Sequence, residues 1–434
     1  MKNVAGVRLV ERDEAVEVVE LPDELRVSLA EIASVAREGL LAMGAAVGLA
    51  VMVEMMDAEM TAKVGASKHA KLADRHANWH GGASGSVVLG GRRVPVDRPR
   101  GRTVDGTEIE LDTYQHFSDD DVLSEVVMER MLAGVATRRH VRVAEPIGAE
   151  LASTARATGR SSVSRRFKAA TQRALDELMS RDLSELDVVA LMLDGVHFAE
   201  QCCVVALAIG GDGTKTPVGL WLGDTENKTI VTALLADLVD RGLSVDGGLL
   251  IVIDGAKALA AAVRKVFGDT ALVQRCTLHK RRNVTDYLPK DQQAFIDRKL
   301  AIAFANPDPD KGLRAARDLA RALENKHPDA AASIREGLEE MFTVRRLGIG
   351  GRLAATLTTT NPCESMISIA RDTTRNVKRW RDGKMIKRWM AAGMLNAERS
   401  FRRIKGHKSM PTLVAALARH TANVTPSCDT ERVA

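Results

Sequence analysis

Short apolar runs of strand length recur between residues 186 and 275 and set the pattern of the chain. Residues 188–193, 202–209 and 216–222 are rich in β-branched and large apolar side chains. The glycine-rich segment 210–213 separates the last two runs and favours a tight hairpin turn. These three runs predict a meander of three successive strands.

Helical spacing then alternates with two further apolar runs. Residues 227–241 carry apolar side chains at helical spacing, and residues 248–253 form a fourth run of strand length. Residues 256–267 predict a second helix, and residues 270–275 a fifth strand. This order predicts an α/β core with a mixed five-stranded sheet.

Two of these predicted strands are followed directly by an aspartate and a glycine. The run 188–193 ends on Asp194, and the run 248–253 ends on Asp254. Carboxylates at the ends of neighbouring buried strands offer the oxygen ligands that divalent cations prefer. The alternative, that each Asp-Gly pair only begins a turn, stays open on this pattern alone.

After residue 275 the pattern is helical for about seventy residues. Residues 292–305, 311–325 and 329–343 are rich in alanine, leucine and charged residues, with breaks at two prolines. This stretch predicts an all-helical insertion. A Thr-Thr-Thr-Asn-Pro segment then begins a new helix that carries Glu364 in its first turn. Glu364 is a third candidate acid, and the alternative is that it only stabilises the start of the helix.

The N-terminal region predicts a helix over residues 25–64. Its stretch 39–53 is uncharged but short for a membrane span, and its Gly and Ala content favours a packed helix. No signal peptide is visible, and the five cysteines form no obvious disulfide framework. We therefore expect a protein of the reducing cytosol.

Positive charge is concentrated rather than spread over the chain. The whole chain has a formal charge of +5, whereas residues 371–408 hold 13 Lys and Arg against 3 Asp and Glu. Most of this segment, residues 378–404, reads as one basic helix. Residues 65–113 are also basic, with short strands expected at 87–89 and 93–96. Both segments suit a polyanionic partner, and a solvated basic surface is the alternative.

A helix-turn-helix pattern precedes the core. Helices are expected at 118–133 and 138–145, then at 149–157 and 162–178 with a short glycine-containing turn between the last two. This arrangement would place the start of the last helix in a DNA major groove. An ordinary helical hairpin is the alternative. Together with the C-terminal basic segment, the candidate DNA-binding residues are Arg160, Ser162, Arg165, Arg166, Lys168, Lys378, Arg379, Lys387 and Arg388.

Cys276 and His279 have half of the spacing of a zinc site. No second pair of Cys or His residues with matching spacing follows. We therefore expect a buried thiol and imidazole in a polar network rather than a tetrahedral zinc site.

Four blocks together resemble the bacterial Mutator-type insertion-sequence transposases, which are DDE enzymes with a ribonuclease-H-like core. The blocks are LMLDGVHF around Asp194, VIDGAKAL around Asp254, QRCTLHKRRNV from Gln274 and TTNPCES from Thr359. The resemblance covers about residues 30–405 and is strongest over 186–380. The Pro-Cys pair before Glu364 and the Ala- and Gly-rich N-terminal helix depart from the family pattern.

The resemblance implies specific roles. Asp194, Asp254 and Glu364 match the family's catalytic acids and would bind two Mg²⁺ or Mn²⁺ ions, while Cys276, His279 and Asn361 would support the site. The implied partner is double-stranded DNA, both the terminal inverted repeats and the target, joined through a 3′ hydroxyl. We also expect a homodimer in the bacterial cytoplasm, associated with the nucleoid and not with membranes.

Two other functions compete with that of a transposase. A domesticated relative would bind DNA without cutting it, and the intact Asp194, Asp254 and Glu364 of this chain argue against that function. A related nuclease would cut without joining. The sequence does not separate the nuclease from the transposase.

The expected domains follow these patterns. They are an N-terminal helical region (1–64), a basic region with short strands (65–117), a helix-turn-helix-like domain (118–182), the first part of a ribonuclease-H-like core (183–276), the helical insertion (277–357), the second part of the core with its basic helix (358–410) and a tail (411–434).

Overall fold

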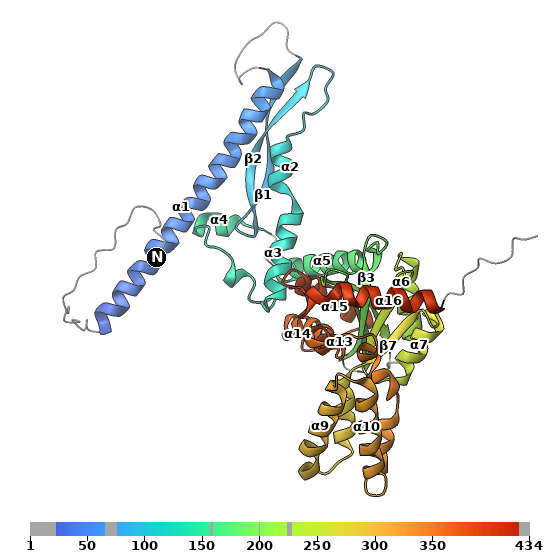
Figure 1. Cartoon of the computed structure of the whole chain (residues 1–434). Coiled ribbons are helices and arrows are strands. Elements are labelled where there is room, and N and C mark those ends of the chain that lie inside the picture. The colour runs from blue at the N-terminus through green and yellow to red at the C-terminus, as the bar shows by residue number, and fades with distance from the viewer. Residues whose placement is uncertain (1–22, 66–75, 157–158, 199, 224–227, 425–434) are drawn as a thin grey trace, which may run out of the picture. The chain divides into compact units, whose positions relative to one another are not determined.

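The computed structural model describes residues 23–65, 76–156, 159–198, 200–223 and 228–424 (Figure 1). The chain divides into two compact units. Unit 1 comprises residues 1–123 and 141–159, and unit 2 comprises residues 124–140 and 160–434. Each unit is described by itself.

Unit 1 is a long helix packed on a β-hairpin. Its elements are α1 (Asp23–Val64), β1 (Ala77–Leu89), β2 (Arg92–Thr103), α2 (Asp112–Ser118), the 3-10 turn η1 (Val141–Val143) and α4 (Ala149–Thr154). The two strands pair antiparallel along most of their length, and both glycines of the Gly90-Gly91 turn have positive φ angles. The hairpin is thus much longer than the short strands that the sequence predicts.

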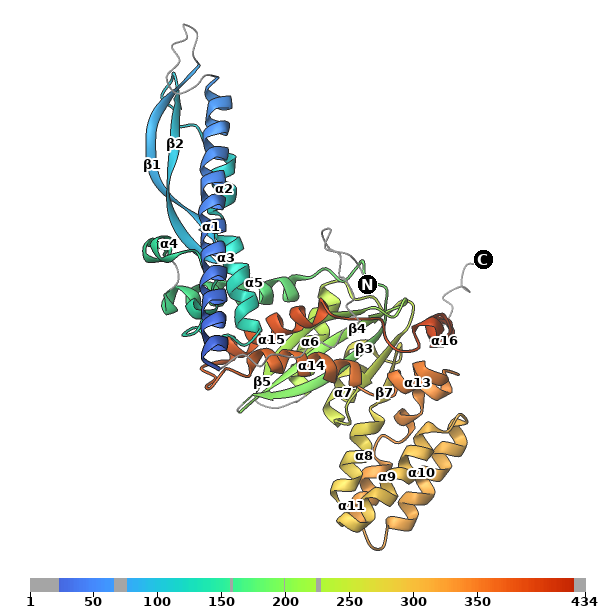
Figure 2. The same cartoon turned by 90° about the vertical axis from the view of Figure 1, so that its left-hand side faces the viewer.

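The inner face of α1 forms the core of unit 1. Met56, Met60 and Val64 are buried against hairpin residues that include Val87 and Val96. Figure 2 shows α1 running beside the hairpin. By length and composition alone, the 26 residues Gly39–Val64 could cross a membrane. This apolar stretch is longer than the uncharged run that the sequence pattern marks.

Unit 2 is built on the five-stranded mixed sheet that the sequence predicts. The strand order is β5-β4-β3-β6-β7, in which β3, β4 and β5 are antiparallel neighbours and β6 and β7 run parallel to β3. The strands are β3 (Val188–Phe198), β4 (Gln201–Gly210), β5 (Lys215–Gly223), β6 (Leu249–Ile253) and β7 (Ala271–Arg275).

Helices cover both faces of this sheet (Figure 2). Side chains of β3 alternate between the faces: Leu191 and Leu193 pack with α6 (Lys228–Asp240) and α7 (Lys257–Phe267). Met192 and Val196 pack on the other face. The helices that contribute to this second cluster include α5 (Arg160–Ser180), α13 (Gly351–Leu357), α14 (Asn361–Thr374), α15 (Gly383–Glu398) and α16 (Met410–Val424).

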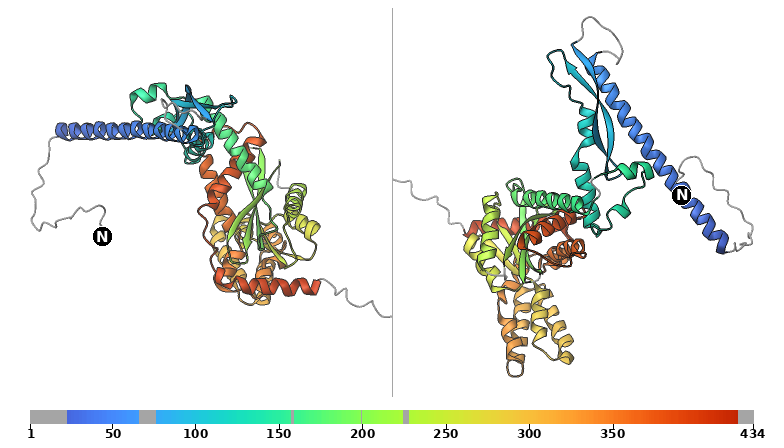
Figure 3. Two further views of the ribbon diagram at one scale, coloured as in Figure 1. Left: turned by 90° about the horizontal axis from the view of Figure 1, so that it is seen from above. Right: turned by 180° about the vertical axis from the view of Figure 1, so that it is seen from behind.

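Residues between β7 and α14 are helical, and those from α8 to Phe342 have a separate apolar core. They form α8 (Thr277–Asp286), α9 (Lys290–Ala305), α10 (Pro309–Leu323), α11 (Pro328–Arg335), the 3-10 turn η2 (Glu339–Met341), α12 (Thr343–Arg346) and α13. In the right-hand view of Figure 3 the yellow and orange helices of this region form a group beyond one end of the sheet.

Three local expectations differ from the structure. Residues 138–145 contain only the turn η1 instead of a helix. The basic helix expected over 378–404 is shorter, because the carboxylate of Asp382 accepts a hydrogen bond from the Met385 backbone and caps α15 at Gly383. Most of the expected tail, residues 411–434, belongs to the helix α16, whose Leu413 and Leu417 are buried in the core. Of this tail, residues 425–434 lie outside the described residues.

The helix α3 (Asp120–Leu132) contributes to a smaller cluster in unit 2. Its Val127 packs with Val163 and Phe167 of α5 and with Trp389 of α15. The Phe167 and Trp389 rings lie 4.6 Å apart. Trp389 of the C-terminal basic segment therefore packs α15 against α3 and α5, which are far away in sequence.

Candidate active site

The end of the parallel ladder places two of the predicted acids side by side. Residues 190–193 of β3 pair in register with residues 250–253 of β6. The next residue on each strand is Asp194 and Asp254. The expectation that β3 ends at Asp194 is wrong, since β3 continues to Phe198 in its antiparallel pairing with β4. What ends at Asp194 is the parallel pairing with β6.

Asp194 is a buried carboxylate, with only 6% of its surface exposed. Its Oδ1 accepts a hydrogen bond from the Gly195 amide at 2.9 Å. Burial raises its pKa to about 7, the charges of Asp254 and Glu364 add to this rise, and the charge of His279 opposes it. Asp254 and Glu364 therefore both lie within electrostatic reach of Asp194.

Asp254 is partly exposed at the start of the loop that leads into α7. Its Oδ1 accepts a hydrogen bond from the Ala256 amide at 2.8 Å. This bond holds the carboxylate at the end of β6 while the chain turns into the helix. The hydrogen bond to Ala256 by itself fits the interpretation that the Asp-Gly pair only begins a turn. The neighbouring Asp194 is what makes Asp254 a candidate site residue.

Glu364 reaches this edge through hydrogen bonds that join distant segments. The Cys276 amide donates to the Ile253 carbonyl at 2.7 Å, and the Thr277 amide donates to the Thr358 carbonyl at 2.9 Å. The start of α8 thereby connects the end of β6 to the turn before α14. The Glu364 carboxylate then accepts a hydrogen bond from the Thr360 hydroxyl at 3.1 Å.

Cys276 and His279 form the polar pair that the sequence predicts. The hydrogen bond to the Cys276 thiol raises the pKa of His279 to about 9, and burial opposes this rise. Burial by itself would raise the pKa of Cys276, but hydrogen bonds from His279 and the backbone lower it overall. His279 Nε2 also lies 3.7 Å from Glu364 Oε1, so a charged imidazole faces this carboxylate.

The pair has a third potential ligand that sequence spacing does not indicate. Ligand atoms of Cys276, His279 and Glu364 all lie within 4.8 Å of one another, so this group could hold a metal ion. A tetrahedral zinc ion would need a fourth ligand such as water. Asn361 opens α14 with its side chain exposed, and its supporting role stays a prediction.

Two buried polar residues, Gln274 and Lys280, brace the segments around the candidate site and were not singled out from the sequence. The Gln274 amide donates to the Arg275 and Met341 carbonyls and accepts from the Val344 amide. The Lys280 ammonium donates to the Ser333 and Glu336 carbonyls at 2.7 and 2.9 Å. Both tie β7 and α8, which flank Cys276, to later helices. Both residues lie in the block QRCTLHK, which carries part of the family resemblance, and this position could have marked them as candidates.

A groove of about 1030 Å³ in unit 2 gathers five of the nine predicted DNA-binding residues. Arg160 and Lys168 come from α5, Lys378 and Arg379 from the segment before α15, and Arg388 from α15. The lining also includes Arg138, Arg381, Trp380 and a single acidic residue, Asp382. The groove is therefore strongly basic.

The other four candidates lie outside that lining. Arg165 is exposed on α5, whereas Ser162, Arg166 and Lys387 are partly buried. The two helices of the predicted helix-turn-helix, α4 and α5, fall in different compact units. In unit 1, the hairpin residues Arg98 and Arg100 form ion pairs with Glu108, which offsets part of that region's positive charge.

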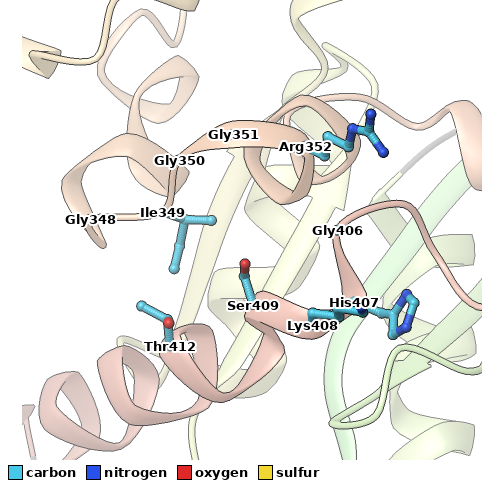
Figure 4. Close-up of a pocket in the computed structure, with 10 residues that line it drawn as sticks. All are labelled: Gly348, Ile349, Gly350, Gly351, Arg352, Gly406, His407, Lys408, Ser409 and Thr412. Carbon is cyan, nitrogen blue, oxygen red and sulfur yellow. The ribbon is translucent and has the colours of Figure 1, made fainter.

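A second pocket, of about 660 Å³, lies between the turn before α13 and the turn before α16. Figure 4 shows Ser409 and Thr412 directed toward Ile349, with Arg352 and His407 farther along the lining. None of the predicted site residues lines it. The pocket is thus separate from the acid cluster.

Comparison with known proteins adds an independent result. Residues 26–403 match the family model described as Transposase, Mutator family. The chain is 31% identical over 205 residues to the transposase for insertion sequence element IS6120 of Mycolicibacterium smegmatis, covering 46% of this chain and 62% of that protein. It is 25% identical over 304 residues to the transposase for ISRM5 of Rhizobium meliloti, covering 68% and 73%.

The alignment with the IS6120 protein thus spans less than two thirds of that relative. The family match, by contrast, covers nearly all of both compact units and includes Asp194, Asp254, Cys276, His279 and Glu364. This chain belongs to the Mutator family of transposases.

Proposed function

We propose that this protein is a DNA transposase that binds the terminal inverted repeats of its insertion sequence and cleaves and joins DNA strands. Asp194, Asp254 and Glu364 act in it as a DDE site on a ribonuclease-H-like core interrupted by a helical insertion. The observation that carries the proposal is the register of β3 and β6, which puts Asp194 beside Asp254, with Glu364 in electrostatic reach.

The donor set suits two Mg²⁺ or Mn²⁺ ions. All three side chains offer carboxylate oxygens, which hard divalent cations prefer. The burial that raises the pKa of Asp194 leaves a carboxylate whose charge a cation would offset. When bound, a pair of such ions activates the attacking hydroxyl and stabilises the leaving oxygen of an in-line phosphoryl displacement.

The protein's own residues position the acids. Gly195 and Ala256 amides hold one oxygen of Asp194 and of Asp254, and the Thr360 hydroxyl holds Glu364. His279, whose pKa is raised to about 9, is positively charged at neutral pH and faces Glu364. We propose that Cys276 and His279 fix the direction of Glu364 and do not touch the DNA.

The basic groove is the proposed contact for double-stranded DNA. Its cations come from α5, the segment before α15 and α15 itself, with the single acid Asp382 among them. Such a surface neutralises phosphates irrespective of sequence. Recognition of the inverted repeats would then need base contacts, for which the exposed Arg165 on α5 is our candidate. We place the protein in the bacterial cytoplasm at the nucleoid, as a homodimer.

The test uses Asp194→Asn, Asp254→Asn and Glu364→Gln in the full chain. Each amide keeps the volume of the acid, so the fold and the binding of a labelled element end should persist. Nicking and joining in Mg²⁺ or Mn²⁺ should fall by about 1000-fold or more, because the lost ligands remove most of the charge stabilisation. Ca²⁺ should support binding with little chemistry.

Asp246→Asn is the matched control. This exposed aspartate precedes β6, at the opposite end of the strand from Asp254, and its replacement should leave nicking and joining unchanged. Near-wild-type cleavage by Glu364→Gln would contradict the site and direct attention to Glu339, Glu340 or Asp372. Cleavage without joining by the wild type would favour a nuclease, and binding without either would favour a domesticated DNA-binding protein.

A further inference from the structure

The helix α1 has a second apolar face that no described residue covers. Its inner face, with Met56 and Met60, packs on the hairpin. The opposite face carries Leu40, Met43, Gly44, Val47, Val51 and Met55, here called the outer stripe. These residues recur at intervals of three and four, which places them on one side of a helix.

The outer stripe is exposed to an unusual degree. Leu40 is 66% exposed, Met43 60% and Val47 57%, and Val51 and Met55 are exposed to similar degrees. With the adjoining Leu41, these side chains expose on the order of 600 Å² of apolar surface, the upper end of what monomeric proteins leave uncovered. Such a surface indicates a binding partner.

We propose that the outer stripe is the surface through which two copies of this chain associate, helix against helix. One patch is not far below the roughly 800 Å² that each partner contributes to a standard interface, and in a two-fold dimer the same patch serves both sides. No charged residue occurs from Gly39 to Val53, and self-associating interfaces are more apolar than those with transient partners. The proposal is independent of the catalytic one.

The spacing of the stripe suits a helix pair. From Leu40 to Met55 it extends roughly 22 Å along the helix, about four turns. No heavy atom lies within 4 Å of the position where a Cβ would stand on Gly44 or Gly48. Two helices can therefore approach closely at these glycines, with Leu40, Val47 and Val51 packing around the point of contact.

A lipid bilayer fits this helix less well, although Gly39–Val64 is long and apolar enough to cross one. A spanning helix needs about 20 residues in contact with hydrocarbon. Here Met56, Met60 and Val64 are buried against the hairpin. Glu59 in addition accepts hydrogen bonds from the Asp112 and Thr113 amides at 2.8 and 2.9 Å, which ties the last turns of α1 to α2.

Neighbouring positions provide the test. Val47 lies in the outer stripe, whereas Ala46 is also exposed but lies about 100° away around the helix. We expect the full-length wild type to sediment at twice the 46.9 kDa of one chain, without DNA or metal. Val47→Glu should raise the dimer dissociation constant by about 100-fold or more, because it buries an unpaired carboxylate in the interface. Ala46→Glu should sediment as the wild type does.

Each other outcome overturns the proposal. A monomeric wild type, or a Val47→Glu variant that stays dimeric, would show that the stripe is not the self-association surface. Binding of the wild type to phosphatidylglycerol-containing vesicles, abolished equally by Val47→Glu and Ala46→Glu, would assign the helix to a membrane. Circular dichroism checks that each variant keeps the fold. Because DNA cleavage is not measured, failure here leaves the catalytic proposal untouched.

Discussion

Asp194 and the outer stripe of α1 depart from the usual distribution of polar and apolar groups in opposite directions. Asp194 is a carboxylate that is only 6% exposed, whereas Leu40 is an apolar side chain that is 66% exposed. Burial disfavours the ionised form of the first, and water disfavours the second. Asp194 is thus a charged group with little access to water, and the outer stripe is an apolar surface exposed to water. We interpret the first as part of a cation site and the second as a surface for another copy of the chain.

Gln274 is a buried polar side chain whose amide has hydrogen-bond partners within the chain. It is also fully buried in unit 2, but its amide is matched by three backbone groups of β7 and the η2 and α12 region. A buried polar group with partners stabilises the fold, while one without them costs stability. The comparison therefore predicts opposite signs for similar substitutions at Gln274 and Asp194.

The largest effect on stability is expected for Gln274→Leu. The substitution keeps the size of the side chain but leaves two buried carbonyls and one amide without their partner. We expect the free energy of unfolding to fall by about 3 kcal/mol. Urea denaturation measures this, with the exposed Gln172→Leu as the control that should change stability little. An unchanged midpoint for Gln274→Leu would show that the Gln274 network contributes nothing.

Asp194→Asn should have a smaller effect of opposite sign in metal-free protein. The folded-state pKa of Asp194 is raised from 3.8 to about 7, so its favourable contribution is present at low pH and lost as pH rises through 7. An amide cannot ionise. The variant should therefore be more stable than the wild type at pH 8 by about 1–3 kcal/mol, with the difference vanishing near pH 4.

Thermal unfolding across this pH range, with and without Mg²⁺, checks the prediction. Mg²⁺ should stabilise the wild type at pH 8 and have little effect on Asp194→Asn, since a ligand that binds only the folded state shifts unfolding. If metal-free Asp194→Asn were the less stable protein at pH 8, the carboxylate would already have sufficient partners within the chain. The comparison with Gln274 would then fail.

The smallest effect on stability is expected in the basic groove, where the charges are exposed. Lys378→Glu with Arg379→Glu should change the free energy of unfolding by less than about 0.5 kcal/mol. Binding of element-end DNA should weaken, and its salt dependence should decrease by about one unit of slope for each phosphate that the variant no longer neutralises. Lys265→Glu on α7 is the control. Unchanged binding at low and moderate salt would leave the groove as a solvated surface.

Sequence alone predicted the sheet core well because its signals are local. The apolar runs at 202–209 and 216–222 correspond to β4 and β5 within one residue at each end, and the run at 188–193 corresponds to the first part of β3. The period of side chains along a strand or helix is set by a few neighbouring residues, so it is readable without a partner. Asp194 and Asp254 were predicted as site residues in the same way, from their positions at the ends of two such runs.

Only the tertiary structure decided what depends on distant segments. β3 continues beyond Asp194 because β4 pairs with it, and α16 is ordered because Leu413 and Leu417 are buried in the core. Only the resemblance linked Glu364 to the other two acids. It lies 110 residues after Asp254, and the hydrogen bonds from Cys276 and Thr277 that connect the two segments leave no local pattern in the sequence. For the same reason, the sequence did not show that the outer stripe is exposed. That depends on the hairpin, which packs on the opposite face of α1. Periodicity shows that a side chain lies on a face, but what covers that face depends on chain far away in sequence.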